Sequence, residues 1–160
     1  MSKFLDTILC RETHRFSLLK YEKDRINNKL EKILATKGYS INLCGKIKNE
    51  NEFKLTDKYT IGIYIQGGGD PAYLKGRWSE EADRAILTIR VNSHLCFPIT
   101  TISIFLFLIP ILFFISFENE ADRYWVPIFL LIVGFTLNAA GNFFKKRLLN
   151  KTLRELGLKK

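Results

Sequence analysis

The stretch "LCFPITTISIFLFLIPILFFISFENEADRYWVPIFLLIVGFTLNAAGNFFKKR", residues 95–147, decides the fold of this chain of 160 residues. It contains two runs without a charged side chain, Leu95–Phe117 and Tyr124–Phe144. At 1.5 Å per residue each run would make a helix of roughly 30–35 Å, which matches a bilayer core of about 30 Å. Buried helices of a soluble bundle normally keep a polar stripe, and these runs have none. The stretch therefore predicts a two-helix transmembrane hairpin over residues 95–144.

Charged residues flank the predicted hairpin unequally. Residues 1–94 hold 17 basic and 12 acidic side chains, the elbow Glu118–Arg123 holds one and three, and residues 145–160 hold seven and one. Basic segments beside a span stay on the cytoplasmic side of a membrane. We therefore expect both termini in the cytoplasm and the acidic elbow on the far side.

Residues 1–94 predict a compact cytosolic domain of the α+β class. Apolar side chains recur every three to four residues in 20–36, which is typical of one amphipathic helix. They alternate with polar ones in six shorter stretches, which predicts strands. These stretches are residues 13–19, 39–44, 53–55, 59–66, 73–78 and 85–91. We expect a small antiparallel β-sheet or open barrel with one helix, joined without a linker to the hairpin.

The last segment, residues 145–160, predicts a basic amphipathic cytoplasmic tail. Its leucines Leu148, Leu149, Leu153 and Leu156 share one side, and basic residues surround the other. Such a helix beside a span usually lies along the anionic inner leaflet. DNA or RNA is a poorer partner for these charges, because the membrane would hold the tail.

Residue types that perform catalysis are scarce. Neither His14 nor His94 has a cysteine or carboxylate at the spacing of metal ligands, and no G-x-S-x-G motif occurs. The three cysteines, Cys10, Cys44 and Cys96, have no paired spacing either. We expect a protein that is not an enzyme and has neither a metal nor another cofactor.

A weak ligand-binding pattern follows the glycine-rich loop Gly67–Asp70. Two cations alternate on the next predicted strand, with aromatic residues close in sequence. Cations can bind phosphate and rings can stack on bases, although a solvated strand face explains the same pattern. The candidate ligand-binding residues are Lys75, Arg77, Tyr73, Tyr64 and Trp78, and Lys46 with Lys48 on the preceding hairpin offers a second position.

Small and amide residues form a stripe in the second apolar run. Gly134, Asn138 and Asn142 recur every four residues and so share one helical face. Small residues let helices approach closely, and an amide in hydrocarbon seeks a polar partner. The stripe packs within the hairpin, lies at an interface between copies or lines a pore. In the first run, Pro110 predicts a kink.

The chain resembles bacterial two-transmembrane β-domain membrane proteins. The likeness rests on strands reading "CGKIKNENEFKL" and "LKGRW" and on "AILTIRVNSH", which enters the membrane. This group includes the cyclic-nucleotide-gated effectors of anti-phage systems of the CBASS and Panoptes kind. The resemblance implies an inner-membrane effector that senses a cyclic oligonucleotide and then changes oligomerisation or disrupts the bilayer. The alternative is a membrane-tethered adaptor whose β-domain binds a protein or a lipid head group.

Overall fold

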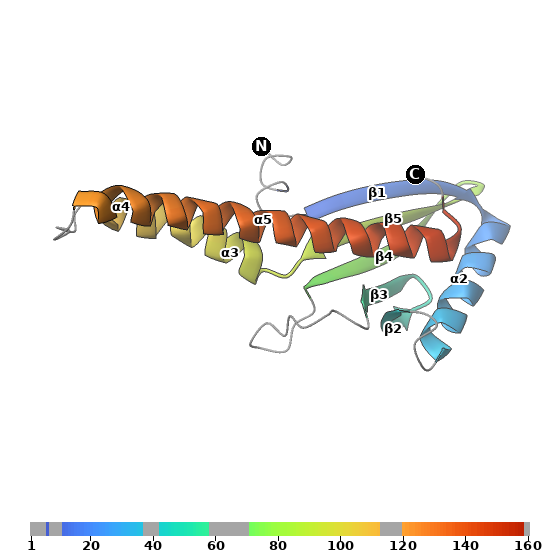
Figure 1. Cartoon of the computed structure of the whole chain (residues 1–160). Coiled ribbons are helices and arrows are strands. Elements are labelled where there is room, and N and C mark those ends of the chain that lie inside the picture. Colours follow the sequence, from blue (N-terminus) through green and yellow to red (C-terminus); the bar gives the residue numbers. More distant parts are fainter. Residues whose placement is uncertain (1–5, 7–10, 37–41, 58–70, 113–119, 159–160) are drawn as a thin grey trace.

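The structure is a computed structural model that describes residue 6 and residues 11–36, 42–57, 71–112 and 120–158. Figure 1 shows a sheet at one end of the molecule and a long helix that extends beyond it. In chain order the elements are β1 Arg11–Leu19, α2 Lys20–Ala35, β2 Leu43–Asn49, β3 Glu52–Asp57, β4 Ala72–Glu81, β5 Arg84–Ser93, α3 Cys96–Ser103, the π-helical turn η1 Ile104–Leu108, α4 Ile109–Leu112 and α5 Glu120–Leu156.

The five strands form one antiparallel sheet in the order β1-β5-β4-β3-β2. The predicted α+β class and antiparallel sheet are confirmed. The predicted barrel is wrong, because β1 and β2 lie at opposite edges and the sheet is open. Helices α2 and α5 cover one face, which buries the apolar side of the strands without closure of the sheet. The predicted strand 59–66 lies outside the described residues.

We call the face that α2 and α5 cover the inner face, and the opposite one the outer face. Strand β4 shows why they differ: Leu74 and Trp78 are buried, whereas Lys75 and Arg77 between them are exposed. Period-two alternation sends successive side chains to opposite faces. The hydrophobic core comprises Ile26, Leu30 and Ile33 of α2, ten strand residues, and Leu148, Leu149, Leu153 and Leu156 of α5.

This core corrects the prediction for residues 145–160. The four leucines of that segment are 0–5 % exposed and pack against the sheet instead of lying on a lipid surface. Burial of each leucine stabilises the fold by roughly 1.5–3 kcal/mol, and a domain with so small a core depends on this stabilisation. Helix α5 then ends in a Schellman motif, in which Gly157 has a φ of 73° and the Leu158 N–H donates to the Leu153 carbonyl at 2.9 Å.

Three local features hold α2 and the strands in place. The Glu22 carboxylate accepts a hydrogen bond from the Leu19 N–H at 3.1 Å at the start of α2. Lys23, one residue later, lies 3.0 Å from the Glu80 carboxylate of β4, and this hydrogen bond lowers the pKa of Glu80. In the sheet, Gly76 faces the Phe53 ring so closely that a Cβ atom there would clash with it.

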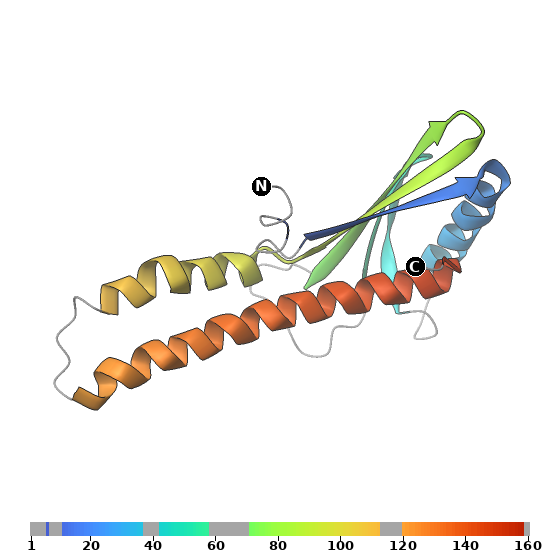
Figure 2. The ribbon, with the colours of Figure 1, turned by 90° about the horizontal axis from the view of Figure 1, so that it is seen from above.

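The segment that follows β5 runs beside the first half of α5, as Figure 2 shows. It begins where His94 Nδ1 accepts a hydrogen bond from the Cys96 N–H at 3.2 Å. The π-helical turn η1 ends two residues before Pro110. Proline lacks an N–H and crowds the carbonyl four residues earlier, so it widens or bends a helix at this place. Among described residues one helix, Arg123–Leu156, is long and apolar enough to cross a membrane, and Cys96–Leu112 is a shorter apolar helix.

Candidate anion-binding face

Four basic side chains stand in one row across the outer face. The strand register pairs Lys46 of β2 with Lys54 of β3, Lys54 with Lys75 of β4, and Lys75 with Arg90 of β5. All four residues are exposed. Opposite residues on neighbouring strands have their Cβ atoms roughly 4.5–5.5 Å apart. The row therefore concentrates four positive charges along one line, and we call it the cation row.

Like charges placed directly opposite each other destabilise a sheet. One carboxylate lies close by, on Glu52 of β3, and it is shared: its oxygens are 3.6 Å from Arg77 Nε and 3.6 Å from Lys48 Nζ. No ion pair between a described acid and any member of the cation row is present. The row is thus an arrangement that favours an external anion.

An aromatic ring and a buried amide border the cation row. Lys54 Nζ lies 5.0 Å and Lys75 Nζ 5.7 Å from the centre of the Tyr73 ring, which is within cation–π range. Asn92, directly opposite Tyr73 on β5, is 6 % exposed, and its Oδ1 has no hydrogen-bond donor among the described residues. Buried amide oxygens normally have a donor, so this one is left unsatisfied within the described residues.

The structure does not bring all five predicted ligand-binding residues together. Lys75, Arg77 and Tyr73 lie together on the outer face. Trp78 does not share that face: it is 3 % exposed in the core, and its indole N–H donates to the Asn27 side-chain oxygen at 3.1 Å. Sequence proximity misled the prediction, because adjacent strand residues point to opposite faces. Tyr64 lies outside the described residues.

Sequence reasoning missed two members of the cation row, Lys54 and Arg90. Each occupies a polar position in an alternating strand, and this is the signal that could have found them. Strand alternation, however, does not say which residues of different strands stand opposite one another. The row requires the register of β2 through β5, which the sequence does not reveal.

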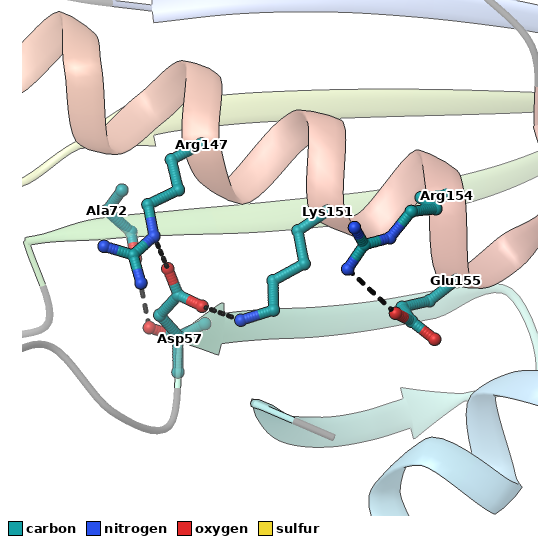
Figure 3. A network of polar contacts seen from close by, with 7 residues as sticks. Asp57, Ala72, Arg147, Lys151, Arg154 and Glu155 are labelled. Atoms are coloured by element: carbon teal, nitrogen blue, oxygen red, sulfur yellow. Dashed lines mark hydrogen bonds and ion pairs between the residues drawn. The ribbon is translucent and has the colours of Figure 1, made fainter. Parts of the chain in front are cut away.

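Ionic contacts tie the sheet to α5 on the inner side. Figure 3 shows Asp57, at the end of β3, between Lys151 and Arg147 of α5. The Asp57 carboxylate is 6 % exposed and lies 2.9 Å from Lys151 Nζ and 3.8 Å from Arg147 Nε. Lys145, also buried, lies 3.5 Å from Glu12 of β1. Buried charges without partners are costly, so these pairs fix how α5 sits on the sheet.

The residues of the predicted stripe on α5 have different surroundings. A Cβ atom at Gly134 would stand 3.1 Å from the Phe105 ring, so this glycine faces the neighbouring segment of the same chain. Asn142 donates to the Asn138 side-chain oxygen at 3.0 Å and to its carbonyl at 3.1 Å. Gly134 thus serves packing within the chain, and the two amides satisfy each other in part.

Within the described residues, no group of three or more histidine, cysteine, aspartate or glutamate side chains could hold a metal ion. Comparison with models of protein families, with curated proteins and with solved structures found no match.

Proposed function

We propose that the protein is an integral membrane effector, without enzymatic activity, whose sheet binds an anionic, phosphate-bearing ligand on the outer face. The observation that carries the proposal is the cation row, Lys46, Lys54, Lys75 and Arg90. Lysine and arginine form strong charge-assisted hydrogen bonds with phosphate oxygens, and the exposed part of Tyr73 suits stacking on a base. A cyclic oligonucleotide combines both features and is the ligand class that the resemblance implies.

In this proposal residues 95–117 and 124–144 cross the bilayer as a hairpin. Large apolar side chains of this region are exposed, and only 11 % of the most apolar 18-residue window of α5 is buried. From Tyr124 to Phe144 is 21 residues, or about 31 Å of helix, close to the thickness of a bilayer core. Tyr124 and Trp125 suit one interface, and the basic residues from Lys145 onward suit the cytoplasmic one of a bacterial inner membrane.

Helix α5 is the element that would transmit ligand binding to the membrane. It is continuous from Glu120 to Leu156, so residues 124–144 would belong to the hairpin while the leucines of 148–156 belong to the core of the sheet. A rigid element shared by two sites can pass a small shift from one to the other. A ligand that bridges β2 to β5 would change the position of α5 on the sheet. This shift would alter how the hairpins associate in a homo-oligomer. The outcome would be membrane disruption in anti-phage defence.

The position of the cation row also favours a second candidate, a membrane-tethered adaptor. Arg90 precedes Ser93, the last residue of β5, by three residues, which is about 10 Å along a strand. Lipid phosphates at the cytoplasmic surface would then lie close to the row. This candidate binds anionic head groups or an acidic protein and needs no nucleotide.

Calorimetry of the purified full chain against cyclic di- and trinucleotides, at two salt concentrations, tests the proposal. We expect binding that weakens as salt rises. Replacement of Lys75 and Arg90 by alanine should weaken binding about a hundredfold or more, since each charge-assisted contact contributes roughly 1.5–3 kcal/mol. Arg154→Ala, on α5 away from the outer face, is the matched control and should leave affinity unchanged.

The same double variant in a vesicle-binding assay separates the two candidates. An effector binds the nucleotides in detergent, where no anionic lipid is present. An adaptor binds none of them, and its sheet associates with vesicles that contain phosphatidylglycerol in a way that depends on Lys75 and Arg90. Absence of both kinds of binding in a folded protein contradicts the anion-binding face altogether.

A further inference from the structure

Two amide side chains of α5 belong to the segment that the proposed hairpin would place in lipid. Asn138 and Asn142 precede Phe144, the last residue of the apolar run, by six and two residues, or about 9 Å and 3 Å of helix. Both residues are half-buried, between the side of α5 that packs against α3 and the exposed side. An amide in hydrocarbon is costly unless its polar atoms have hydrogen-bond partners.

The two amides pair with each other only in part. The Asn142 side-chain nitrogen donates to the Asn138 side-chain oxygen at 3.0 Å and to the Asn138 carbonyl at 3.1 Å. An asparagine side chain offers two N–H donors and one oxygen acceptor. Within the described part of the chain, the Asn138 nitrogen and the Asn142 side-chain oxygen therefore keep a donor group and an acceptor group without a partner.

The first apolar segment does not complete this pairing. Thr101, the buried hydroxyl of α3, donates to the Phe97 carbonyl at 2.8 Å and to the Gly134 carbonyl at 3.3 Å. Among the described residues, no hydrogen bond joins either amide to α3, η1 or α4. Packing within the hairpin thus leaves both amides incompletely satisfied.

The amides continue a line of apolar side chains that has the spacing of a coiled coil. Leu131, Phe135, Asn138 and Asn142, which we call the seam, are separated by four, three and four residues. Every long helix has such lines, but this one holds both amides, and another helix could pack along it. Phe135 is 66 % exposed, and its ring lies edge to face with Phe105, with 5.6 Å between ring centres. The apolar surface beside the amides is therefore already ordered.

A second copy of the chain is the partner that fits the seam. The charges that flank the hairpin give every copy the same orientation in the membrane, so equivalent asparagines of two copies lie at the same depth. An amide is both donor and acceptor, and two amides at one depth can bind each other. Lipid tails offer neither group. The seam carries no charged residue, so its association with a copy brings no like charges together.

We propose that two copies of this chain associate in the membrane through parallel α5 helices, with Asn138 at the centre of the contact. This interface rests on the proposed function, because it needs residues 124–144 to lie in lipid. It names the surface through which the hairpins of the effector associate. The Asn138 nitrogen of one copy donates to the Asn138 or Asn142 side-chain oxygen of the other, and Leu131 and Phe135 pack beside these bonds. A buried asparagine fixes register and partner number in coiled coils in the same way.

Sedimentation equilibrium of the full chain in mild detergent, without ligand, measures this association. We expect a dimer whose dissociation constant rises roughly tenfold or more when Asn138→Leu and Asn142→Leu are combined, because two-fold symmetry removes each hydrogen bond twice. Asn138→Gln keeps an amide and should retain most of the association. Thr136→Val is the matched control: its hydroxyl donates to the Ile132 carbonyl of its own helix, so the dissociation constant should change less than about twofold.

Disulfide cross-linking in vesicles locates the surface independently. Phe135→Cys lies on the seam, whereas Phe129→Cys lies about 120° away around the helix. The two rings that these changes remove are 66 % and 63 % exposed, so the variants are matched. Oxidation should link Phe135→Cys chains into dimers above the level that the native cysteines give, and Phe129→Cys should add nothing to that level.

The outcomes separate this interface from the rest of the proposed function. A protein that a carbonate wash removes from vesicles contradicts the proposed hairpin and the interface together. An inserted protein that stays monomeric, or whose association survives the double leucine change, overturns the interface alone. Cross-linking of Phe129→Cys in place of Phe135→Cys also overturns it. A dimer that depends on Asn138 but binds no nucleotide supports the interface and contradicts the sensor.

Discussion

At the residue scale, the cation row places like charges opposite one another, which lowers the stability of the sheet. Lys75 stands between Lys54 and Arg90, and no described carboxylate pairs with it. A sheet selected for stability alone would alternate opposite charges across its strands. If the row binds an anion as proposed, this cost belongs to the function, and it can be measured.

We predict that Lys75→Glu stabilises the free protein. The new carboxylate would lie opposite Lys54 on one side and Arg90 on the other, which should raise the free energy of unfolding by roughly 0.5–1 kcal/mol at low salt. Chemical denaturation measures the change, and the gain should shrink in 1 M salt because the charges are screened. Lys75→Gln should give a smaller gain. Destabilisation by Lys75→Glu would show that the row is already neutralised.

Thr152 carries a second prediction at this scale. It is a fully buried residue of α5, and its hydroxyl has no hydrogen-bond partner among the described residues. Thr152→Val keeps the shape and removes an unsatisfied polar group, so the free energy of unfolding should rise by about 1 kcal/mol. Thr136→Val, at an exposed position of the same helix whose hydroxyl donates to the Ile132 carbonyl, is the control and should bring no gain. A loss in Thr152→Val would reveal a bound water.

At the element scale, the contacts of α5 with the sheet decide how the helix is seated. Asp57 is the described acid that faces two cations of α5, Lys151 and Arg147, and these are 17 % and 37 % exposed. Partial exposure moderates the cost of breaking such pairs, so the expected effect lies below that of a fully buried ion pair.

We predict that Asp57→Asn lowers the free energy of unfolding by about 1–3 kcal/mol, because Lys151 keeps its charge near the core and loses its closest partner. Thermal or chemical unfolding in detergent measures the loss. Glu155→Gln is the matched control: Glu155 pairs with Arg154 at 3.5 Å on the surface, and such exposed pairs contribute less than about 1 kcal/mol. Equal effects of the two variants would refute a special role for Asp57.

A further prediction concerns the close contact between α3 and α5. A Cβ atom at Gly141 would stand 3.1 Å from the Phe97 Cβ and 3.4 Å from the Ser93 hydroxyl. Gly141→Leu should therefore separate the two helices and lower the melting temperature by several degrees. Ala139→Leu, two residues earlier at an exposed position, should be tolerated. A melting temperature that falls equally in both variants would point to a lipid effect instead.

The sequence predicts the helices and strands better than it predicts which of them pack together. Local periodicity predicted α2 and the strands β1, β4 and β5, because the inner face selects apolar residues at a fixed spacing. The leucines of residues 145–160 were recognised as one apolar side, but their partner was assigned to lipid. An amphipathic helix reveals that it covers something apolar, and a sheet and a bilayer are equally apolar. Likewise, Trp78 and Lys75 are close in sequence, but they are an odd number of residues apart on a strand and so point to opposite faces of the sheet.

At the scale of the whole molecule, the sheet depends on a helix that follows it by about 50 residues along the chain. Leu148, Leu149, Leu153 and Leu156 supply one layer of its core. Residues 1–94 alone would expose the part of the apolar inner face that α5 covers, and domains of this size are marginal even when complete. The sheet and the last turns of α5 therefore form one folded unit, and the rest of α5 joins this unit to the apolar hairpin.

This dependence leads to a prediction about excision of the hairpin. Ser93, at the end of β5, lies next to Gly141 of α5, so the chain leaves the sheet and returns to it at nearly the same point. Replacement of residues 95–140 by a flexible linker of about six Gly and Ser residues can span this gap at a small entropic cost. The shortened chain should be soluble, monomeric and cooperatively folded, with the ligand affinity of the full protein.

Residues 1–94 without the helix are the matched comparison, and they should aggregate or lack a cooperative thermal transition by circular dichroism. Leu149→Asp in the shortened chain should reproduce that loss, because it buries an unpaired charge in the core. Cooperative folding of residues 1–94 alone would show that the sheet is complete without α5. In that case α5 could not transmit a ligand-induced change, and the effector proposal would lose its route from the outer face of the sheet to the membrane.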